Sequence, residues 1–169
     1  MIFNAYCHVC GSALELRPCE GESTEIPYCV KCGEYRFAAF NVAVCTALFN
    51  SDYSKLLMMR QYGREKYNFL AGYITQGEDA ETALKREMLE EMGMYPEKIE
   101  YLYSAYFQKS NTLMLNFLTT VKTESLEQAS KSEVDDAQWF NSFEQAYEAV
   151  IKGSLAERLL KYVAPRFAR

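Results

Sequence analysis

One stretch of the chain, residues 80–92, constrains the fold more than any other. It reads AETALKREMLEEM, and its apolar side chains recur every three or four positions, which places them on one face of a helix. Gly93 follows directly, and glycine often adopts the left-handed conformation that ends a helix. The sequence therefore predicts a helix over residues 80–92 whose buried face is formed by Ala80, Leu84, Met88 and Met92.

Three glutamates of this helix, Glu87, Glu90 and Glu91, lie beside the apolar face and partly within it. A solvated acidic face would normally lie opposite the core. Carboxylates at the edge of a buried face repel one another and lose hydration unless positive charge lies among them. One arginine, Arg86, cannot neutralise three acids, whereas a divalent cation with oxygen ligands can. The geometry thus favours a metal site over a solvated helix face.

The residues around this helix resemble the signature of the Nudix hydrolases. Residues 72–94 read GYITQGEDAETALKREMLEEMGM and match the signature at every defined position. The matching residues are Gly72, Glu78, Arg86, Glu87, apolar Met88, Glu90, Glu91, Gly93 and apolar Met94. The resemblance implies the Nudix fold, an α+β arrangement with a mixed β-sheet sandwiched between helices.

The resemblance also implies a chemistry. In Nudix hydrolases a loop–helix–loop holds Mg²⁺ or Mn²⁺ against a diphosphate, water attacks phosphorus, and a nucleoside diphosphate linked to another moiety is split. Glu87, Glu90 and Glu91 would be metal ligands, or ligand and water-activating base, and which of them is the base stays open. Arg86 would orient the glutamates and Glu78 would brace the loop, so we expect Glu90, Glu87 and Arg86 to be catalytic, and Gly72, Glu78 and Gly93 to be structural.

Two further metal ligands are implied outside the helix. The carbonyl of Ala71, which precedes the signature glycine, often supplies a metal bond in this family. A further acid often precedes the last strand in an E-[IV]-x-x-A-x-W pattern, and here EVDDAQW places Glu133 there. The alternative interpretation of Glu133 is an exposed loop acid.

The cysteines near the N-terminus form the only internal repeat. YCHVCG and YCVKCG together give C-x2-C-x18-C-x2-C, and two residues between cysteines let both sulfurs point at one ion. This spacing predicts a structural zinc ribbon with the ligands Cys7, Cys10, Cys29 and Cys32. The alternatives are two disulfides or free thiols. His8, the only histidine, is expected to be a spacer rather than a substitute ligand, and Cys45 a buried core thiol.

The composition of the chain changes near residue 39. We expect a zinc ribbon over residues 1–38 and a Nudix domain over residues 39–169. Strands are predicted at 40–49, 56–62, 99–107, 112–121 and 136–140, with a polar loop before the last. Capping boxes at Ser142 with Gln145 and at Ser154 with Glu157 predict two C-terminal helices.

A four-cysteine ribbon joined to this signature resembles the NADH pyrophosphatase group, whose members cut NAD(H) into AMP and nicotinamide mononucleotide. The match is incomplete, because that group carries an SQPWPFPxS-type segment where this chain reads SAYFQKSNTLM (104–114). The ribbon and the signature together make NAD(H) the expected substrate, and NAD-capped RNA is a further candidate. The missing segment leaves ADP-ribose or a nucleotide sugar as the alternative. A non-catalytic binding module is a second alternative. The resemblance also implies a homodimer.

Several residues are candidates for contacts with the substrate. Tyr73 and Phe37 match aromatic positions of the pyrophosphatases, where they would stack on a base or on nicotinamide. Ser110 and Gln61 are candidates for polar contacts. For each of these, a place in the core or on the surface is the simpler alternative.

The bulk composition excludes some other functions. A net charge of −5 argues against a protein whose main task is coating nucleic acid. No apolar run approaches the length of about 18 residues that is needed to span a bilayer, and the first residues lack the pattern of a secretory signal. We therefore expect a cytoplasmic location, where cysteines more often bind metal than form disulfides.

Overall fold

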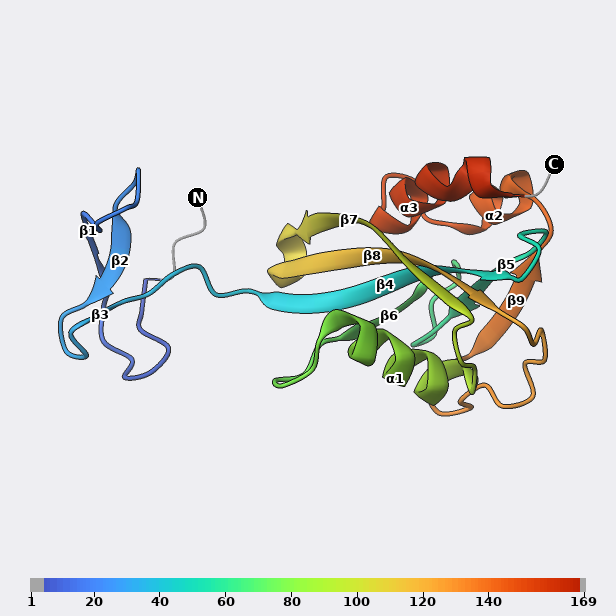
Figure 1. The fold of residues 1–169 in the computed structure, drawn as a ribbon, viewed down its shortest axis with the longest axis horizontal. Coiled ribbons are helices and arrows are strands. Elements are labelled where there is room, and N and C mark those ends of the chain that lie inside the picture. The colour runs from blue at the N-terminus through green and yellow to red at the C-terminus, as the bar shows by residue number, and fades with distance from the viewer. Residues whose placement is uncertain (1–4, 168–169) are drawn as a thin grey trace. The chain divides into compact units, whose positions relative to one another are not determined.

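The computed structural model describes residues 5–167, which form two compact units divided after Phe40. In the N-terminal unit, three short strands, β1 (Glu15–Arg17), β2 (Ile26–Cys29) and β3 (Glu34–Tyr35), make an antiparallel sheet in that order (Figure 1). Among the described residues of this unit only Cys7 and Cys29 are buried. An apolar core of that size cannot hold a unit together, so the cohesion must come from the cysteines.

The C-terminal unit contains a six-stranded mixed sheet. Its order is β7-β8-β4-β5-β9, and β6 also pairs with β4, at the part of β4 that β5 does not reach. β4 and β8 are parallel, whereas the other neighbours are antiparallel. The strands are β4 (Asn41–Asn50), β5 (Leu56–Arg60), β6 (Leu70–Tyr73), β7 (Lys98–Phe107), β8 (Thr112–Val121) and β9 (Asp136–Phe140).

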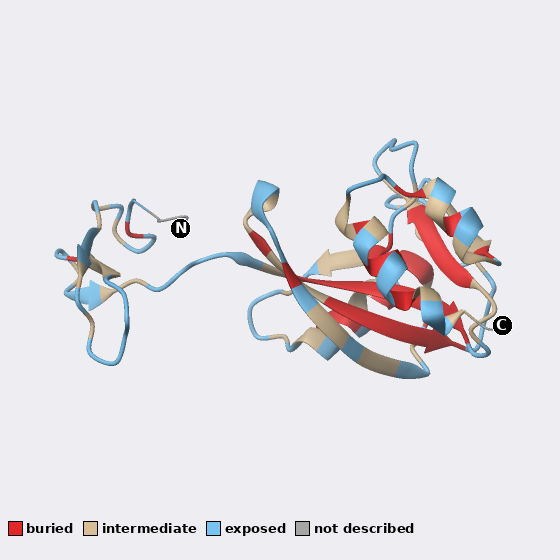
Figure 2. Ribbon diagram, turned by 90° about the horizontal axis from the view of Figure 1, so that it is seen from above, coloured by how far each residue is buried: buried red, intermediate tan, exposed pale blue. Residues whose placement is uncertain are grey.

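Helices cover both faces of this sheet. α1 (Ala80–Met92) lies on one face, and α2 (Phe143–Ala149) and α3 (Leu155–Val163) lie on the other (Figure 1). Side chains of β4 alternate between the two faces, because successive residues of a strand point in opposite directions. Val44 and Leu48 pack on the α1 side, and Phe49 packs on the α3 side. The buried core therefore follows β4 and its neighbours (Figure 2).

Two short 3₁₀ turns complete the described elements. They are η1 (Gln108–Ser110), which joins β7 to β8, and η2 (Ala164–Arg166), which follows α3. No helix of the described chain is long and apolar enough to cross a membrane.

The expected α+β fold with a mixed sheet between helices is confirmed, as is the helix over residues 80–92. Both C-terminal capping boxes are confirmed, because Ser142 and Ser154 each accept a hydrogen bond from the backbone N–H three residues later. The strand predicted at 56–62 was too long by two residues. β5 ends at Arg60, since Tyr62 and Gly63 adopt left-handed φ values of 58° and 67° that a strand cannot contain. β6 was not expected, because it is short and contains a glycine.

Candidate functional site

Both ends of α1 are set by local hydrogen bonds. Asp79 accepts a hydrogen bond from the backbone N–H of Thr82 at 2.7 Å, which caps the first turn. Gly93 adopts φ 66°, and its N–H donates to the carbonyls at the end of the helix. A Cβ at Gly93 would also lie 2.5 Å from Cβ of Gln128. These contacts fix which side chains of α1 face the sheet.

The three glutamates at the edge of the apolar face differ in burial. Glu91 is 4% exposed, whereas the side chains of Glu87 and Glu90 are 14% and 54% exposed. The apolar residues Leu84, Met88 and Met92 are fully buried. The acids thus form a series from the core to the solvent at one edge of the helix.

Gly72 on β6 makes room for Glu87. A Cβ at Gly72 would overlap the carboxyl group of Glu87, so any other residue would displace that carboxylate. Gly72 pairs with Val44 on β4, which holds the backbone of this strand in place. The requirement for glycine here is close approach rather than an unusual backbone conformation.

Arg86 connects four groups of the site. Its Nε and Nη2 donate to the two carboxylate oxygens of Glu78 at 2.7 and 3.0 Å. Nη1 donates to Glu87 at 2.7 Å and to Glu90 at 3.0 Å, and Nη2 also donates to the carbonyl of Tyr73. The guanidinium lowers the pKa of Glu78 to about 2, because it hydrogen-bonds the charged form. Arg86 therefore ties the loop before α1 to two of the three glutamates.

Glu91 has no cationic partner among the described residues. One carboxylate oxygen, Oε1, accepts a hydrogen bond from the side-chain amide of Gln61 at 2.7 Å. The other, Oε2, is buried and has no hydrogen-bond partner within residues 5–167. Burial, together with the charges of Glu87, Glu133 and Glu90, raises the pKa of Glu91 to about 7, although the hydrogen bond from Gln61 acts in the opposite direction. A buried carboxylate oxygen without a partner is costly in free energy, and a bound cation would offset that cost.

The remaining expected metal ligands lie near this group in the fold. Ala71 precedes Gly72 on β6 and is half-buried. Glu133 is exposed in the loop before β9, and its charge acts on Glu91. That loop is tied to α1, since Ser130 donates its N–H to the carbonyl of Glu91 at 2.8 Å. The loop thus brings an acid that is distant in sequence toward the end of α1.

The residues of this edge fit a divalent cation. The donors are carboxylates and a backbone carbonyl, which are the hard oxygen ligands that Mg²⁺ and Mn²⁺ prefer. Oε2 of Glu91 is buried and has no partner in the part of the chain that the structure describes, so it is available to ligate an ion. Arg86 supplies one positive charge for three nearby acids, Glu78, Glu87 and Glu90, so the set stays anionic.

The residues expected to contact the substrate lie in three different places. Tyr73 is 55% exposed beside the Arg86 network, to which its carbonyl belongs. Ser110 lies in η1, where its hydroxyl hydrogen-bonds that of Thr112 at 2.8 Å. Phe37 is exposed in the N-terminal unit. Gln61, also a candidate for a polar contact with the substrate, donates a hydrogen bond to Glu91, and no sequence pattern indicated that partner.

The four cysteines of the two C-x2-C turns lie close together in the N-terminal unit. Their sulfur atoms all lie within 4.8 Å of one another, and within the described residues no other such group of three or more His, Cys, Asp or Glu ligands occurs. The sulfurs of Cys10 and Cys29 are 3.5 Å apart and those of Cys7 and Cys32 are 4.0 Å apart. Tetrahedral zinc with Zn–S bonds of about 2.3 Å separates sulfurs by about 3.8 Å, so the cluster fits that ion.

The two cysteine turns have the same backbone geometry. Gly11 donates its N–H to the carbonyl of Cys7, and Gly33 donates to that of Cys29, both at 2.8 Å. The φ angles of the two glycines are 72° and 73°. Arg36 donates to the sulfur of Cys7 at 3.3 Å and lowers the pKa of that thiol. His8 is exposed and outside the cluster, and Cys45 is buried in the other unit, as expected.

Comparison with known proteins decides the family. A family model described as the NUDIX domain matches residues 39–159, well over half of the chain. This chain belongs to the Nudix family. The residues that the resemblance assigned to metal and to catalysis therefore lie within a Nudix domain, and residues 41–169 are called the Nudix unit from here on.

The relatives include proteins named NAD-capped RNA hydrolase NudC. That of Pseudomonas aeruginosa is 27% identical over 139 residues, covering 82% of this chain and 48% of that protein. That of Stutzerimonas stutzeri is 26% identical over 165 residues, covering 97% and 58%. This chain therefore spans about half the length of the curated relatives it matches. They support the resemblance to the zinc-ribbon NADH pyrophosphatase-like group.

Solved structures support the fold. A NUDIX hydrolase from Nitrosomonas europaea aligns with a TM-score of 0.62 at 19% identity. The alignment covers 96% of this chain and 91% of that one. At this level of identity the likeness extends to the fold alone.

Proposed function

We propose that this chain is a divalent-metal-dependent Nudix diphosphatase that cleaves a nucleoside diphosphate linked to another moiety. The proposed substrate is NAD(H), which water would split into AMP and nicotinamide mononucleotide. The observation that carries the proposal is the state of Glu91. Its carboxylate is buried, is not neutralised by a described cation, and keeps one oxygen free at the edge of a complete set of signature glutamates.

The metal ligands would be Glu87, Glu90 and Glu91, with the carbonyl of Ala71 and the carboxylate of Glu133. When bound, Mg²⁺ or Mn²⁺ neutralises phosphate oxygens, polarises phosphorus and lowers the pKa of a bound water. Glu90 is the best-placed base among the three, because its side chain is the most exposed and can reach a water molecule. Arg86 holds Glu87 and Glu90 in position and leaves Glu91 to another partner.

The substrate would lie beside the exposed ring of Tyr73, whose face is free to stack on a base or on nicotinamide. Ser110, whose hydroxyl hydrogen-bonds that of Thr112, stays a weaker candidate, as does Phe37, an exposed residue of the N-terminal unit. In the N-terminal unit the four cysteines would hold a structural Zn²⁺. We also propose a homodimer, on the basis of the family resemblance.

The direct test is to incubate the purified protein with Mg²⁺ and NADH and to separate the products. Release of AMP and nicotinamide mononucleotide is the expected result. A panel with NAD, ADP-ribose, nucleotide sugars, diadenosine polyphosphates and NAD-capped RNA ranks the substrates by kcat/KM. Turnover of ADP-ribose without turnover of NADH would overturn the NAD(H) assignment and leave the hydrolase assignment in place.

One observation favours a second candidate, an ADP-ribose or nucleotide-sugar diphosphatase. The segment SAYFQKSNTLM lacks the Trp-Pro-Phe-Pro centre of the NADH pyrophosphatases. In the structure this segment forms the end of β7, the η1 turn and the start of β8. Within it, the hydroxyl of Tyr106 donates a hydrogen bond to the side-chain oxygen of Asn111. The third possibility, a binding module without activity, predicts no turnover of any compound in the panel. It conflicts with the intact set of signature glutamates.

A further inference from the structure

The partners of the signature glutamates fall into two kinds. Glu87 and Glu90 accept hydrogen bonds from a cation, the Arg86 guanidinium. Within the described chain the carboxylate of Glu91 accepts a hydrogen bond from a neutral amide instead, Nε2 of Gln61, at 2.7 Å. Because this bond uses Oε1, it also determines which oxygen of Glu91 is left without a partner. A neutral amide thus holds the buried acid, Glu91, whereas a guanidinium holds the other two.

The backbone at Gln61 is itself held in place. It follows the last residue of β5, Arg60, whose carbonyl accepts a hydrogen bond from Asp135 at 2.9 Å. A tight turn follows, in which Arg64 donates its N–H to the carbonyl of Gln61 and Gly63 donates to the Asp135 carboxylate at 2.7 Å. The side chain of Gln61 therefore projects from a strand end that is anchored on both sides.

We propose that Gln61 is a positioning residue for Glu91, which holds Oε1 of the buried carboxylate so that Oε2 is presented to a divalent cation. The inference rests on the proposed function, since it assumes that Glu91 is a metal ligand. Partners of ligating groups commonly matter in this way, and their loss typically lowers metal affinity or activity by about 10- to 100-fold.

A neutral donor suits this position for an electrostatic reason. A lysine or arginine here would form an ion pair with a carboxylate that is 4% exposed, and in such surroundings the attraction is strong. That cation would compete with the metal for the charge of Glu91. An amide orients one oxygen and leaves the full charge available to the ion. We therefore expect the site to bind a divalent cation more tightly with glutamine at position 61 than with an apolar residue or a cationic one.

The test is direct binding of Mn²⁺, without substrate, to the zinc-loaded protein, measured by the EPR signal of free Mn²⁺. Gln61→Leu removes the donor at similar size and should weaken Mn²⁺ binding about tenfold. Gln61→Lys supplies a donor with a charge and should weaken binding by more than this, while the melting temperature stays the same or rises. The matched control is Gln138→Leu, because Gln138 is an exposed glutamine on β9. Its side-chain oxygen accepts a hydrogen bond from the hydroxyl of Tyr67. This control should bind Mn²⁺ as the wild type does.

The lysine variant separates positioning from simple stabilisation. If Gln61 only stabilised the fold, a charged donor at the same place would preserve both stability and Mn²⁺ binding. Affinity within twofold of wild type in either Gln61 variant would overturn the inference alone. Absence of Mn²⁺ binding by the wild-type protein, or wild-type affinity in Glu91→Gln, would overturn the proposed metal site and this inference together.

Discussion

The two proposed ligand sets of this protein, the four cysteines and the signature glutamates, are built in opposite ways. The four sulfurs of the N-terminal unit already lie within 4.8 Å of one another, and the only buried residues described there are two of those cysteines. The glutamates of the Nudix unit lie on a helix that packs on a large core, and they are held by Arg86 and Gln61 rather than by one another. The cysteines are expected to stabilise the N-terminal unit, whereas the core of the Nudix unit positions the glutamates.

This difference implies different consequences when a ligand is lost. A unit without an apolar core depends on its metal for folding, because binding free energy and folding free energy are then the same quantity. A carboxylate that is buried with no cationic partner lowers the stability of the unit that contains it. Loss of one of the four clustered cysteines should therefore unfold the N-terminal unit. Loss of the Glu91 carboxylate should abolish activity while the Nudix unit stays folded.

The largest effect is expected in the cysteine set. Cys29→Ser removes a fully buried ligand, so the protein should lose its zinc and residues 5–40 should unfold, since structural zinc contributes about 10–16 kcal/mol in zinc-finger peptides. Zinc content and hydrogen exchange of each unit are the measurements. Cys19→Ser is the matched control, because Cys19 lies outside the cluster, and it should retain zinc. A wild-type protein purified without zinc would refute the zinc ribbon.

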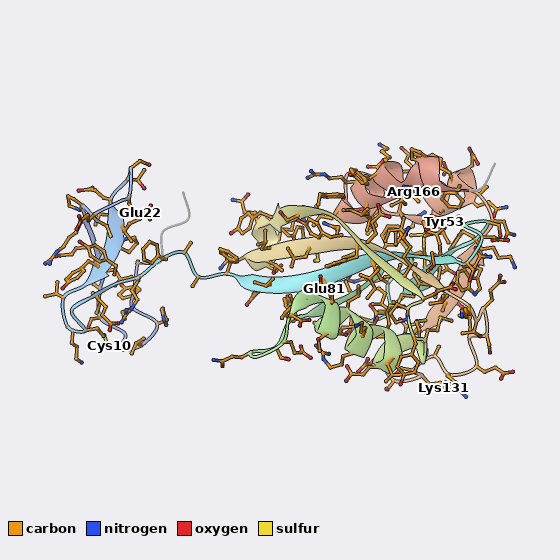
Figure 3. All side chains as sticks on the ribbon, in the orientation of Figure 1. Cys10, Glu22, Tyr53, Glu81, Lys131 and Arg166 are labelled. Atoms are coloured by element: carbon orange, nitrogen blue, oxygen red, sulfur yellow. The ribbon has the colours of Figure 1, made fainter. Side chains whose placement is uncertain are left out.

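The next effect concerns Glu91. Glu91→Gln should lower kcat by about two to four orders of magnitude, because a neutral amide is a poor ligand for a divalent cation. The free energy of unfolding at pH 8 should not fall, since a buried charge and its repulsion by Glu87, Glu90 and Glu133 are removed. Steady-state kinetics and denaturant melts measure the two quantities. Glu81→Gln, an exposed position on the same helix (Figure 3), is the control and should change neither. A variant that keeps its activity would contradict the role assigned to Glu91.

Two glycines of the signature provide a narrower comparison. Gly72→Ala should displace the Glu87 carboxylate and lower metal affinity and kcat by about 10- to 100-fold, with a small effect on stability. Gly93→Ala should instead destabilise by about 1–2 kcal/mol, because the φ of 66° is strained for any residue with a Cβ. Melts and kinetics of both variants distinguish the roles. Equal losses of stability in the two would show that Gly72 has no special relation to Glu87.

The smallest effect is expected at a carboxylate that, unlike Glu91, is well supplied with donors. Glu157 accepts from the N–H of Gly153 and pairs with Lys161, which lowers its pKa to about 2. The folded state therefore gains stability above the unfolded pKa of about 4.3, and this gain is lost as the pH falls toward 2. The melting temperature of Glu157→Gln should lie below that of the wild type at pH 6, and the gap should narrow as the pH falls from about 4 toward 2. Glu144→Gln serves as the control. A gap that stays constant across this range would contradict the assignment.

Much of the fold could be predicted because its signals are local. The spacing of Leu84, Met88 and Met92 and the glycine at position 93 placed α1 at its observed residues. The apolar runs at β4 and β8 and the capping serines did the same for their elements. β6 and the early end of β5 could not be predicted, because pairing with β4 decides the first and the left-handed turn at Tyr62 decides the second.

The same division applies to the site. The sequence by itself determined which residues form the glutamate set and the cysteine set, since each occurs at a spacing that helix or turn geometry converts into proximity. Only the tertiary structure decided how the glutamates differ. In the folded chain Glu91 is buried, and Gln61 donates a hydrogen bond to one of its carboxylate oxygens. Arg86 donates to Glu87 and Glu90. The physical reason is that burial and hydrogen-bond partners depend on strands and loops far away in sequence, which no local pattern records.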